Sequence, residues 1–589
     1  MALIRFNRPS VFRSLSPCLY SSSSSDSSSS LRGPSYYHNV GKEPLVYRSI
    51  GQQLELTAQS YPDREGIVSI YENNRLTFGS ILEQCNRLAA SFKRLGLERG
   101  DRVGIWAPNY AFWYITMLAS SRAGLISVGI NPAFQTSEIE YCINKVNLNA
   151  IVAPDVFKTT HYYDILKTVC PEIGDCEPGK LASRTAPSLK SVIIHSKDKF
   201  PGAFQYEDIF NYATEDAITQ IQNSQRDIQP DWPCNIQFTS GTTGQPKATV
   251  ISHFSLLNNG IHAAQRNELN TKHHKICVQV PFFHTYGVTV GIVAGMIYGS
   301  TLVLPSAYFS PKASIAAINE ERCTVTYGTP TMYVDLIKKV IDSNAILTTP
   351  EIAVTGGASC SPKLLENIKH YLKMKKVKNA FGQTEATSVL SQSLPDETED
   401  HVLHTVGHVT DHVEVKVIDK DGNVVPFGEP GELCCRGYLN CLGYYGDEEK
   451  TKELISPDGW LRTGDQFILQ EDGYGRIVGR LKEMVIRGGE NIFPKEIEDF
   501  LNTHPDIVES HVIGVPDERM GEELCAFISL KDGKPHLTHD DLKEFGAGKI
   551  AHFKIPRHIR VVHDFPKTVS GKIQKFKLVQ QYKDSQDEK

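Results

Sequence analysis

Residues 239–247 form a short polar segment whose side chains suit the binding of a polyphosphate. Hydroxyls, glycines and a cation make up most of it: Thr239, Ser240, Gly241, Thr242, Thr243, Gly244 and Lys247. Glycine lets the backbone approach an anion, and hydroxyls and an ammonium donate hydrogen bonds to phosphate oxygens. The spacing is not that of a Walker A motif, G-x-x-x-x-G-K-[ST]. We therefore expect a phosphate-binding loop of another kind.

Strands are predicted on both sides of this loop. Ile236 and Phe238 precede it, residues 249–251 follow it, and Ser252 is suited to cap the next helix. The loop is therefore expected to be a turn between two strands.

A carboxylate elsewhere in the chain has the chemistry needed to hold a metal ion beside phosphates. In residues 381–385, Glu385 follows Phe381, Gln383 and Thr384, and Mg²⁺ usually binds through one or two carboxylates plus substrate phosphates.

A lysine near the end of the chain could neutralise an anion. Lys572 follows the flexible pair Ser570-Gly571, and a mobile cation can neutralise developing negative charge. Judged alone, Lys572 fits better a solvated lysine of a basic tail that includes Lys567, Lys575 and Lys577.

Together these segments resemble the signatures of the adenylate-forming superfamily, which contains acyl-CoA synthetases, luciferases and peptide-synthetase adenylation domains. The resemblance extends from about residue 50 to about residue 580 of the 589. It implies a large N-terminal domain of α/β layers with a β-barrel-like region, followed by a small mobile α+β domain. We expect the large domain at residues 41–480 and the small one at residues 481–589.

The resemblance also implies roles for the nucleotide-binding residues. The 239–247 loop would hold the triphosphate, Phe381 would stack on adenine, and Gln383 would lie in the same site. Thr384 would contact the α-phosphate and Glu385 would ligate magnesium. Asp465 and Arg480 would bind ribose, and Lys572 would be the catalytic lysine.

A second group of residues is implied at the acyl and coenzyme A paths. His284 would gate the path between the carboxylate and coenzyme A, and Gly356, Gly357 and Ala358 would wall the acyl tunnel. Gly488 and Gly489 would line the pantetheine tunnel once the small domain pivots at residues 480–483. Many relatives carry Asp where this chain has Glu483, which leaves the pivot residue open.

The implied reaction uses ATP, Mg²⁺, a carboxylic acid and coenzyme A, and makes an acyl-adenylate and then a thioester. Residues 237–238 and 486–492, with the leader, most resemble those of mitochondrial medium-chain acyl-CoA synthetases, so a medium-chain fatty acid is expected. An aryl-acid ligase, a luciferase-like oxygenase and a non-catalytic nucleotide-binding protein remain alternatives. A peptide-synthetase domain is disfavoured because no carrier domain follows before Lys589.

Periodic patterns predict the elements that position these residues. Residues 78–95 and 112–123 have the apolar spacing of helices, and residues 101–106 have that of a buried strand, an alternation typical of parallel sheets covered by helices. After about residue 409, alternating valines and an Asp-Gly turn predict antiparallel strands. A helix at 495–502 and strands at 510–515 and 524–530 are expected beyond residue 480.

Composition limits the alternatives. Hydrophobic residues make up 40% and charged residues 22%, as in soluble globular proteins, and a net charge of −6 gives no reason to expect a nucleic-acid partner. The first 40 residues are Arg- and Ser-rich and poor in acids, as in mitochondrial transit peptides, which indicates the matrix. The uncharged stretch within 285–311 is expected to be a buried helix and strand rather than a membrane span. Oligomeric state is not indicated.

A histidine cluster and the residue after Lys247 lead to two further structural expectations. His401, His404, His408 and His412 are spaced like a helical metal site, but Gly407 and the valines after it are expected to break any helix. Ala248 stands where relatives commonly carry Gly, which would cost on the order of 1 kcal/mol if the backbone there were left-handed.

Overall fold

The computed structural model describes residues 33–239, 245–358, 360–487, 490–517, 519–534, 536–547, 549–550, 552–568 and 571–587. The predicted leader up to residue 32, the loop residues Ser240, Gly241, Thr242, Thr243 and Gly244, and the pair Gly488-Gly489 lie outside the described residues.

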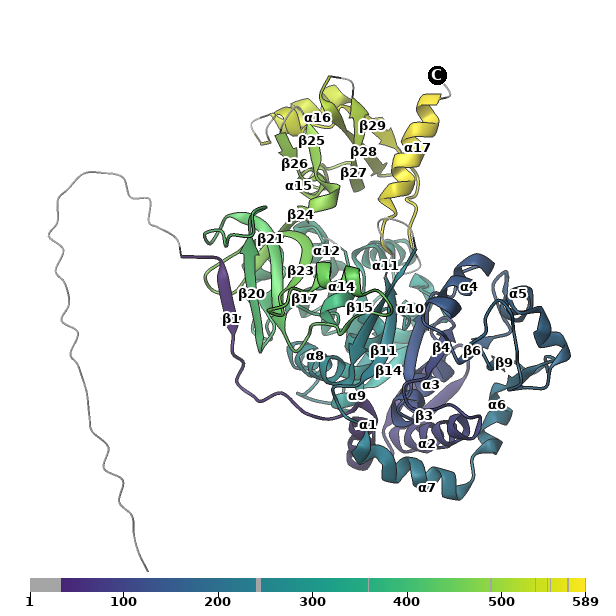
Figure 1. The fold of residues 1–589 in the computed structure, drawn as a ribbon. Coiled ribbons are helices and arrows are strands. Elements are labelled where there is room, and N and C mark those ends of the chain that lie inside the picture. The colour runs from purple at the N-terminus through teal and green to yellow at the C-terminus, as the bar shows by residue number, and fades with distance from the viewer. Residues whose placement is uncertain are drawn as a thin grey trace, which may run out of the picture. The chain divides into compact units, whose positions relative to one another are not determined.

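The first sheet has eight strands in the order β10-β9-β6-β4-β5-β11-β12-β22. Strands β4, β6, β9 and β11 of this sheet are labelled in Figure 1. Its strands are β4 (Arg102–Trp106), β5 (Ile126–Ile130), β6 (Ala150–Pro154), β9 (Ser191–His195), β10 (Ala203–Gln205), β11 (Pro233–Thr239), β12 (Lys247–Ser252) and β22 (Gly443–Tyr444). The pairings from β10 to β11 are parallel, whereas β12 is antiparallel to both of its neighbours. The β11–β12 hairpin therefore carries the predicted phosphate loop at its turn.

The second sheet has nine strands in the order β19-β18-β17-β16-β15-β13-β14-β2-β3. These are β2 (Glu65–Ser69), β3 (Asn74–Thr77), β13 (Lys275–Val278), β14 (Thr301–Leu304), β15 (Val325–Gly328), β16 (Ile352–Gly356), β17 (Lys376–Phe381), β18 (Ser391–Gln392) and β19 (His408–Val409). The six strands from β17 to β2 are parallel, and the edges are antiparallel.

Helices fill the space between these two sheets and cover their outer faces. Between the sheets, α3 (Ala111–Arg122) packs against β4, β5 and β2, and every one of its residues is buried. The other helices up to residue 404 are α1 (Ile50–Ser60), α2 (Phe78–Arg94), α4 (Thr136–Lys145), α5 (Tyr162–Val169), α6 (Tyr206–Ile209), α7 (Glu215–Ser224), α8 (His253–Arg266), α9 (Ala294–Ile297), α10 (Pro311–Glu320), α11 (Pro330–Ser343), α12 (Pro362–Tyr371) and α13 (Glu399–His404). A π-helix (Tyr286–Val293) runs into α9 and is wholly buried.

A third sheet is antiparallel, in the order β1-β20-β21-β23-β24. Its strands are β1 (Tyr36–Asn39), β20 (Val413–Ile418), β21 (Pro430–Gly437), β23 (Leu461–Leu469) and β24 (Gly475–Arg480), with α14 (Glu448–Leu454) between β22 and β23. Val413, Val415 and Val417 are all buried, as their alternation predicts.

The described residues from Val485 onward form a small sheet with three α-helices. Its strands are β25 (Val485–Arg487), β26 (Glu490–Ile492), β27 (Ile507–Asp517), β28 (Gly521–Leu530) and β29 (His558–Val561), and its helices are α15 (Pro494–Leu501), α16 (His539–Gly546) and α17 (Lys575–Asp587). The 3₁₀ turn at Leu481–Glu483 connects β24 to this part. The predicted helix and both predicted strands are confirmed within a few residues.

The structure also tests local predictions. The helix predicted at 78–95 is α2, which Thr77 caps by accepting a hydrogen bond from the Ser80 N–H at 3.2 Å. Ser252 caps α8 in the same way. Ala248 lies in β12 and is not among the residues with positive φ, so no left-handed penalty arises. Among the described residues, no helix is long and apolar enough to cross a membrane.

One predicted boundary was wrong. The folded part was expected to begin near residue 41, but β1 at Tyr36–Asn39 pairs antiparallel with residues 413–416 of β20. This polar segment joins the sheet edge through backbone hydrogen bonds to a strand that is almost four hundred residues away. Such a pairing cannot be predicted from the local sequence of residues 36–39.

Arg266 is a buried cation that joins α8 to the edge of the second sheet. Its guanidinium donates to the carbonyl oxygens of Gln392 at 2.9 Å and Val409 at 2.7 Å, and to Asp411 Oδ1 at 3.3 Å. We expect Arg266→Met to destabilise the large domain by ~3 kcal/mol, because buried carbonyls and a carboxylate lose their donor. Differential scanning calorimetry should show a lowered Tm, with the exposed Arg226→Met as control. An unchanged Tm would contradict this role.

Candidate active site

Every described residue predicted for the site lines a single cavity of about 3710 Å³. These residues are Thr239, Lys247, His284, Gly356, Gly357, Ala358, Phe381, Gln383, Thr384, Glu385, Asp465, Arg480 and Lys572. They come from all three sheets of the large part and from the C-terminal turn that precedes α17. Folding therefore brings together residues that are spread over more than three hundred positions.

Two neighbouring strands of the second sheet end at this cavity. Because β16 and β17 are parallel, their carboxyl ends share one edge, where Gly356 pairs with Ala380. A Cβ at Gly356 would lie 2.7 Å from the Ala380 carbonyl oxygen, so the position requires glycine. Gly357 has φ +82°, and with Ala358 it turns the exposed backbone along the cavity wall.

The turn after β17 presents Thr384 and Glu385. It is so tight that a Cβ at Gly382 would lie 1.7 Å from the Ser388 carbonyl oxygen. Thr387 (φ +55°) and Ser388 (φ +111°) adopt left-handed conformations that non-glycine residues rarely occupy. The Thr387 hydroxyl donates to the Leu439 carbonyl at 2.6 Å, which helps to hold the strained turn in place.

Tyr444 connects Glu385 with Lys247. The Tyr444 hydroxyl donates to Glu385 Oε1 at 2.8 Å, and Lys247 Nζ lies 4.7 Å from the centroid of the Tyr444 ring. Burial and the nearby Glu385 raise the pKa of Tyr444 well above its ordinary value, so its hydroxyl keeps the donated proton. The sequence analysis missed Tyr444, which lies in a two-residue strand and in no recognisable motif.

Asp465 and Arg480 face each other across β23 and β24, with Arg480 Nε 2.9 Å from Asp465 Oδ1. The Asp465 side chain is only 3% exposed, and burial raises its pKa, an effect that Arg480 opposes. Its Oδ2 has no hydrogen-bond partner among the described residues, and neither has Gln383 Nε2. Unpartnered polar atoms that are buried beside a cavity fit a ligand that carries hydroxyls or ring nitrogens.

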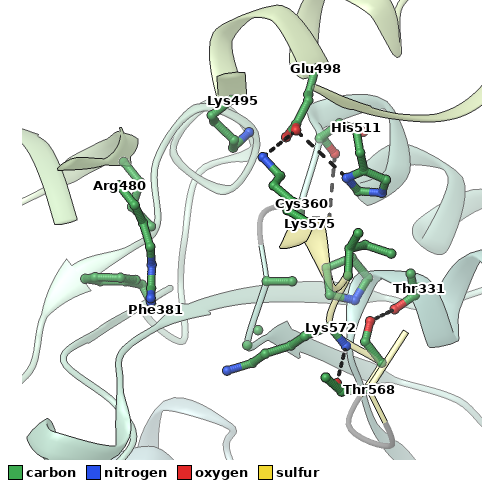
Figure 2. Close-up of a pocket in the computed structure, with 18 of the residues that line it drawn as sticks. Thr331, Cys360, Phe381, Arg480, Lys495, Glu498, His511, Thr568, Lys572 and Lys575 are labelled. Carbon is green, nitrogen blue, oxygen red and sulfur yellow. Dashed lines mark hydrogen bonds and ion pairs between the residues drawn. The ribbon is translucent and has the colours of Figure 1, made fainter. Parts of the chain in front are cut away.

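Phe381 occupies the floor of the same region. Its ring stacks on that of Phe467 with centroids 6.1 Å apart and an interplanar angle of 25°. Figure 2 shows Phe381 and Arg480 among the residues that line the cavity. The ring is thus oriented by Phe467 while it still lines the cavity.

Lys572 lies in a turn of the C-terminal part that contacts α11 (Figure 2). The Thr331 hydroxyl donates to the Gly571 carbonyl at 2.7 Å, and the Thr568 hydroxyl accepts from the Lys572 N–H at 3.0 Å. Burial, then the cation of Arg480, lowers the pKa of Lys572 to about 8, although Glu385 and Asp465 oppose this. No described carboxylate lies within ion-pair distance of its ammonium.

His284 is neutral in this environment. Burial, and to a smaller extent Lys572, lowers its pKa to about 3. Its Nδ1 accepts a hydrogen bond from the Tyr286 N–H at 3.1 Å, which places the ring proton on Nε2. His284 can therefore donate one hydrogen bond into the cavity but carries no charge.

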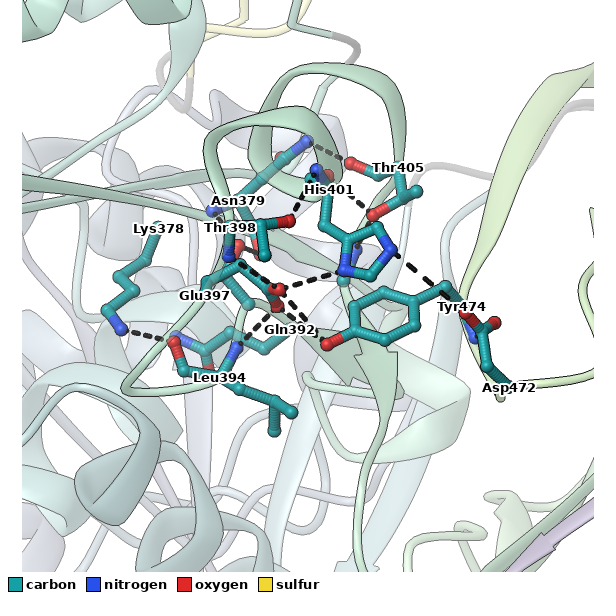
Figure 3. Close-up of polar contacts among 12 residues, drawn as sticks. Lys378, Asn379, Gln392, Leu394, Glu397, Thr398, His401, Thr405, Asp472 and Tyr474 are labelled. Carbon is teal, nitrogen blue, oxygen red and sulfur yellow. Dashed lines mark hydrogen bonds and ion pairs between the residues drawn. The ribbon is translucent and has the colours of Figure 1, made fainter.

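The histidines at 401–412 do not form a metal site. His401 and His404 lie on α13, whereas His408 lies in β19, so the predicted helix break is confirmed. Figure 3 shows His401 engaged instead with Glu397 at 3.0 Å and stacked on Tyr474 with centroids 3.9 Å apart. Within the described ranges, no group of three His, Cys, Asp or Glu side chains is placed to hold a metal.

Comparison with known proteins gives two matching family models. The model described as AMP-binding enzyme matches residues 54–445, and that described as AMP-binding enzyme C-terminal domain matches residues 496–572. The chain is 41% identical over 546 residues to "Medium-chain acyl-CoA ligase ACSF2, mitochondrial" from Danio rerio, covering 92% of this chain and 90% of the relative. It is 37% identical over 535 residues to "Putative acyl-CoA synthetase YngI" from Bacillus subtilis, covering 91% and 97%.

Solved structures share this fold. An anthranilate CoA ligase, AuaEII, in complex with anthranoyl-AMP aligns with a TM-score of 0.80 at 23% identity, covering 92% of this chain and 99% of that one. ATP-bound MatB from Rhodopseudomonas palustris aligns with a TM-score of 0.76 at 24% identity, covering 91% and 99%. Both likenesses concern the fold.

The Asp465–Arg480 pair predicts a pH-dependent stability. Arg480→Met should raise the pKa of Asp465 further, so the folded state would hold a proton that the unfolded state releases at about pH 4. The stability of Arg480→Met should then fall as pH rises from about 4 to the raised pKa of Asp465 in the folded state. Its Tm relative to the wild type should therefore be lower at pH 7 than at pH 5. We expect the free energy of unfolding to be reduced by roughly 1 kcal/mol at pH 7, a small effect because Arg480 is 45% exposed.

Thermal melts at both pH values measure this effect. Asp465→Asn in the Arg480→Met background removes the titrating group and should abolish the difference between the two pH values. If Arg480→Met lowers the Tm equally at pH 5 and pH 7, the pKa of Asp465 in the folded state does not depend on Arg480.

Proposed function

The chain belongs to the AMP-binding enzyme family, and we propose that it is an ATP-dependent acyl-CoA synthetase that acts on a medium-chain fatty acid. The observation that carries the proposal is the half-buried Lys572 ammonium, which has no carboxylate at ion-pair distance among the described residues and shares one cavity with Glu385 and Asp465. A cation without a carboxylate at contact distance is suited to receive anions from a substrate. The names of the relatives supply the acid class and coenzyme A.

In the first half-reaction, a carboxylate oxygen of the fatty acid attacks the α-phosphorus of ATP, and pyrophosphate leaves. Lys572 neutralises charge where the carboxylate meets the α-phosphate, and Thr384 contacts the same phosphate. Lys247 and the adjoining loop hold the β- and γ-phosphates. The carboxylate oxygen, a poor leaving group by itself, thereby becomes part of a good one, AMP.

Glu385 is the residue we assign to Mg²⁺. A carboxylate facing a phosphate-binding cavity is the donor that Mg²⁺ prefers, and Tyr444 occupies only Oε1 of this one. When bound, the ion would neutralise phosphate charge. Tyr444 orients Glu385 toward the cavity for this role.

The nucleoside is assigned to the residues with unused polar atoms. Asp465 Oδ2 can accept from a ribose hydroxyl, and the half-exposed Arg480 can donate to the ribose. Gln383 Nε2 can donate to an acceptor of the nucleotide, and Phe381 offers the adenine an aromatic surface.

The second half-reaction uses a different arrangement of the two proposed domains, which are joined at residues 480–481. Rotation at residues 480–483 withdraws Lys572 and brings Gly488 and Gly489 to the pantetheine arm. The coenzyme A thiol then attacks the acyl carbonyl and AMP departs. Neutral His284 gates this path, and Gly356, Gly357 and Ala358 wall the acyl tunnel.

We assign the enzyme to the mitochondrial matrix. Arg-rich, Ser-rich and acid-poor composition in residues 1–40 supports import, and relatives carry the word mitochondrial in their names.

Pyrophosphate and AMP release with fatty acids of four to eighteen carbons tests the activity. We expect turnover that depends on coenzyme A and peaks at medium chain length. Lys572→Ala should reduce pyrophosphate release on the order of 100-fold, because the cation at the developing charge is lost.

The same assay separates the alternatives. Turnover with benzoate or anthranilate but not with fatty acids would indicate an aryl-acid ligase. Light emission in the presence of a luciferin, ATP and oxygen would indicate a luciferase-like enzyme. Pyrophosphate without a thioester would mean a different acceptor. Nucleotide binding by calorimetry without any turnover would overturn the enzymatic proposal.

Activity should decline at alkaline pH. The pKa of Lys572 is lowered to about 8, so the ammonium is present below that pH and is lost as pH rises through it. The kcat/KM for ATP, which reports the free enzyme, should therefore fall above about pH 8. In Lys572→Arg the maximum should be lower, but the alkaline decline should disappear because arginine stays charged. An identical decline in that variant would assign it to another group.

A further inference from the structure

Lys575, three residues after Lys572, is held by two carboxylates. It is the first residue of α17, and its Nζ lies 2.7 Å from Glu498 Oε1 and 3.2 Å from Glu483 Oε2. Burial alone would lower the pKa of Lys575, but Glu498 and Glu483 together raise it above its ordinary value. Lys575 is thus a charged anchor with partners on two different elements.

The two partners have different positions. Glu498 lies on α15 and also accepts from the Val512 N–H at 2.8 Å, so it is fixed to β27 of the C-terminal sheet (Figure 2). His511 Nδ1 lies 3.9 Å from the same carboxylate. Glu483 instead ends the 3₁₀ turn that follows β24, within the segment at which we propose the small domain rotates. Lys575 therefore connects the small-domain sheet with the pivot segment.

Backbone hydrogen bonds brace the short segment that leads from Lys572 to the start of α17. The Thr568 N–H donates to the Lys572 carbonyl at 2.7 Å, and the Gln574 N–H donates to the Pro566 carbonyl at 2.8 Å. Only Ile573 and Gln574 separate the two lysines. We therefore expect a displacement of Lys575 to reach Lys572 through this braced segment.

We propose that Lys575 is a positioning residue for the first half-reaction: by pairing with Glu483 and Glu498 it fixes the start of α17 to the pivot segment and holds Lys572 in the cavity. The inference rests on the proposed function. Rotation at 480–483 changes the Lys575–Glu483 contact, while the Glu498 contact moves with the small domain. The Glu483 contact thus belongs to the arrangement that forms the adenylate.

The test measures the two half-reactions separately. The first is pyrophosphate release from ATP and the best fatty acid without coenzyme A; the second is thioester formation from supplied acyl-adenylate and coenzyme A. Lys575→Met should slow the first roughly tenfold or more, the value of a lost charge-assisted hydrogen bond. The second should stay within about twofold, and the KM for ATP should change less than kcat.

Matched variants isolate the cause. Lys577→Met removes an exposed lysine from the same helix and should leave both half-reactions unchanged. Glu483→Gln removes the pivot contact while leaving Glu498 in place, and should reproduce the selective loss even if Lys575→Met fails to fold. Lys575→Arg should restore much of the adenylation rate, because it keeps the charge.

Equal slowing of both half-reactions in Lys575→Met and Glu483→Gln would overturn the proposal and indicate a merely structural role. An unchanged adenylation rate in these variants would also overturn it. Failure of the proposed function is distinguishable, because the wild-type enzyme would then release no pyrophosphate with any acid.

Discussion

An ammonium that is half-buried and has no carboxylate at ion-pair distance among the described residues costs free energy, and at Lys572 this cost is the central constraint on the cavity. Its pKa of about 8 means that burial and Arg480 outweigh the attraction of Glu385 and Asp465. The folded chain therefore leaves part of the compensation to anions that a substrate brings. The same principle applies to Asp465, whose buried Oδ2 has no hydrogen-bond partner among the described residues and is available to a ligand.

The same constraint explains why the site draws on distant parts of the chain. Parallel strands β16 and β17 end at one edge and supply backbone there, whereas the antiparallel β23–β24 pair sets Asp465 opposite Arg480. Neither strand pair supplies Lys572, which comes from the C-terminal turn, where the Thr331 hydroxyl of α11 donates to the Gly571 carbonyl. One such hydrogen bond is worth about 1 kcal/mol, so this contact is compatible with the proposed withdrawal of Lys572.

Sequence patterns predicted the elements well because those depend on local chemistry: α2 is delimited by the Thr77 cap and Gly96, and the valines of β20 alternate. Motifs with unusual spacing located the cavity residues, but their roles came from family resemblance. What the sequence could not supply is long-range pairing. Tyr444 reaches Glu385 through a two-residue strand, and Tyr36–Asn39 become a strand only because β20 offers an edge.

Lys572 and Lys575 show most clearly where sequence reasoning ends. Both belong to one basic tail, three residues apart, and nothing local distinguishes their side chains. In the fold their pKa values move in opposite directions, since Lys575 meets Glu498 and Glu483 while Lys572 meets no carboxylate at contact distance among the described residues. Lys575 forms ion pairs with protein carboxylates and, in our proposal, anchors the start of α17. Lys572 can then be held in the cavity as a cation without such a partner. Tertiary structure thus gives different roles to two lysines of the same basic tail.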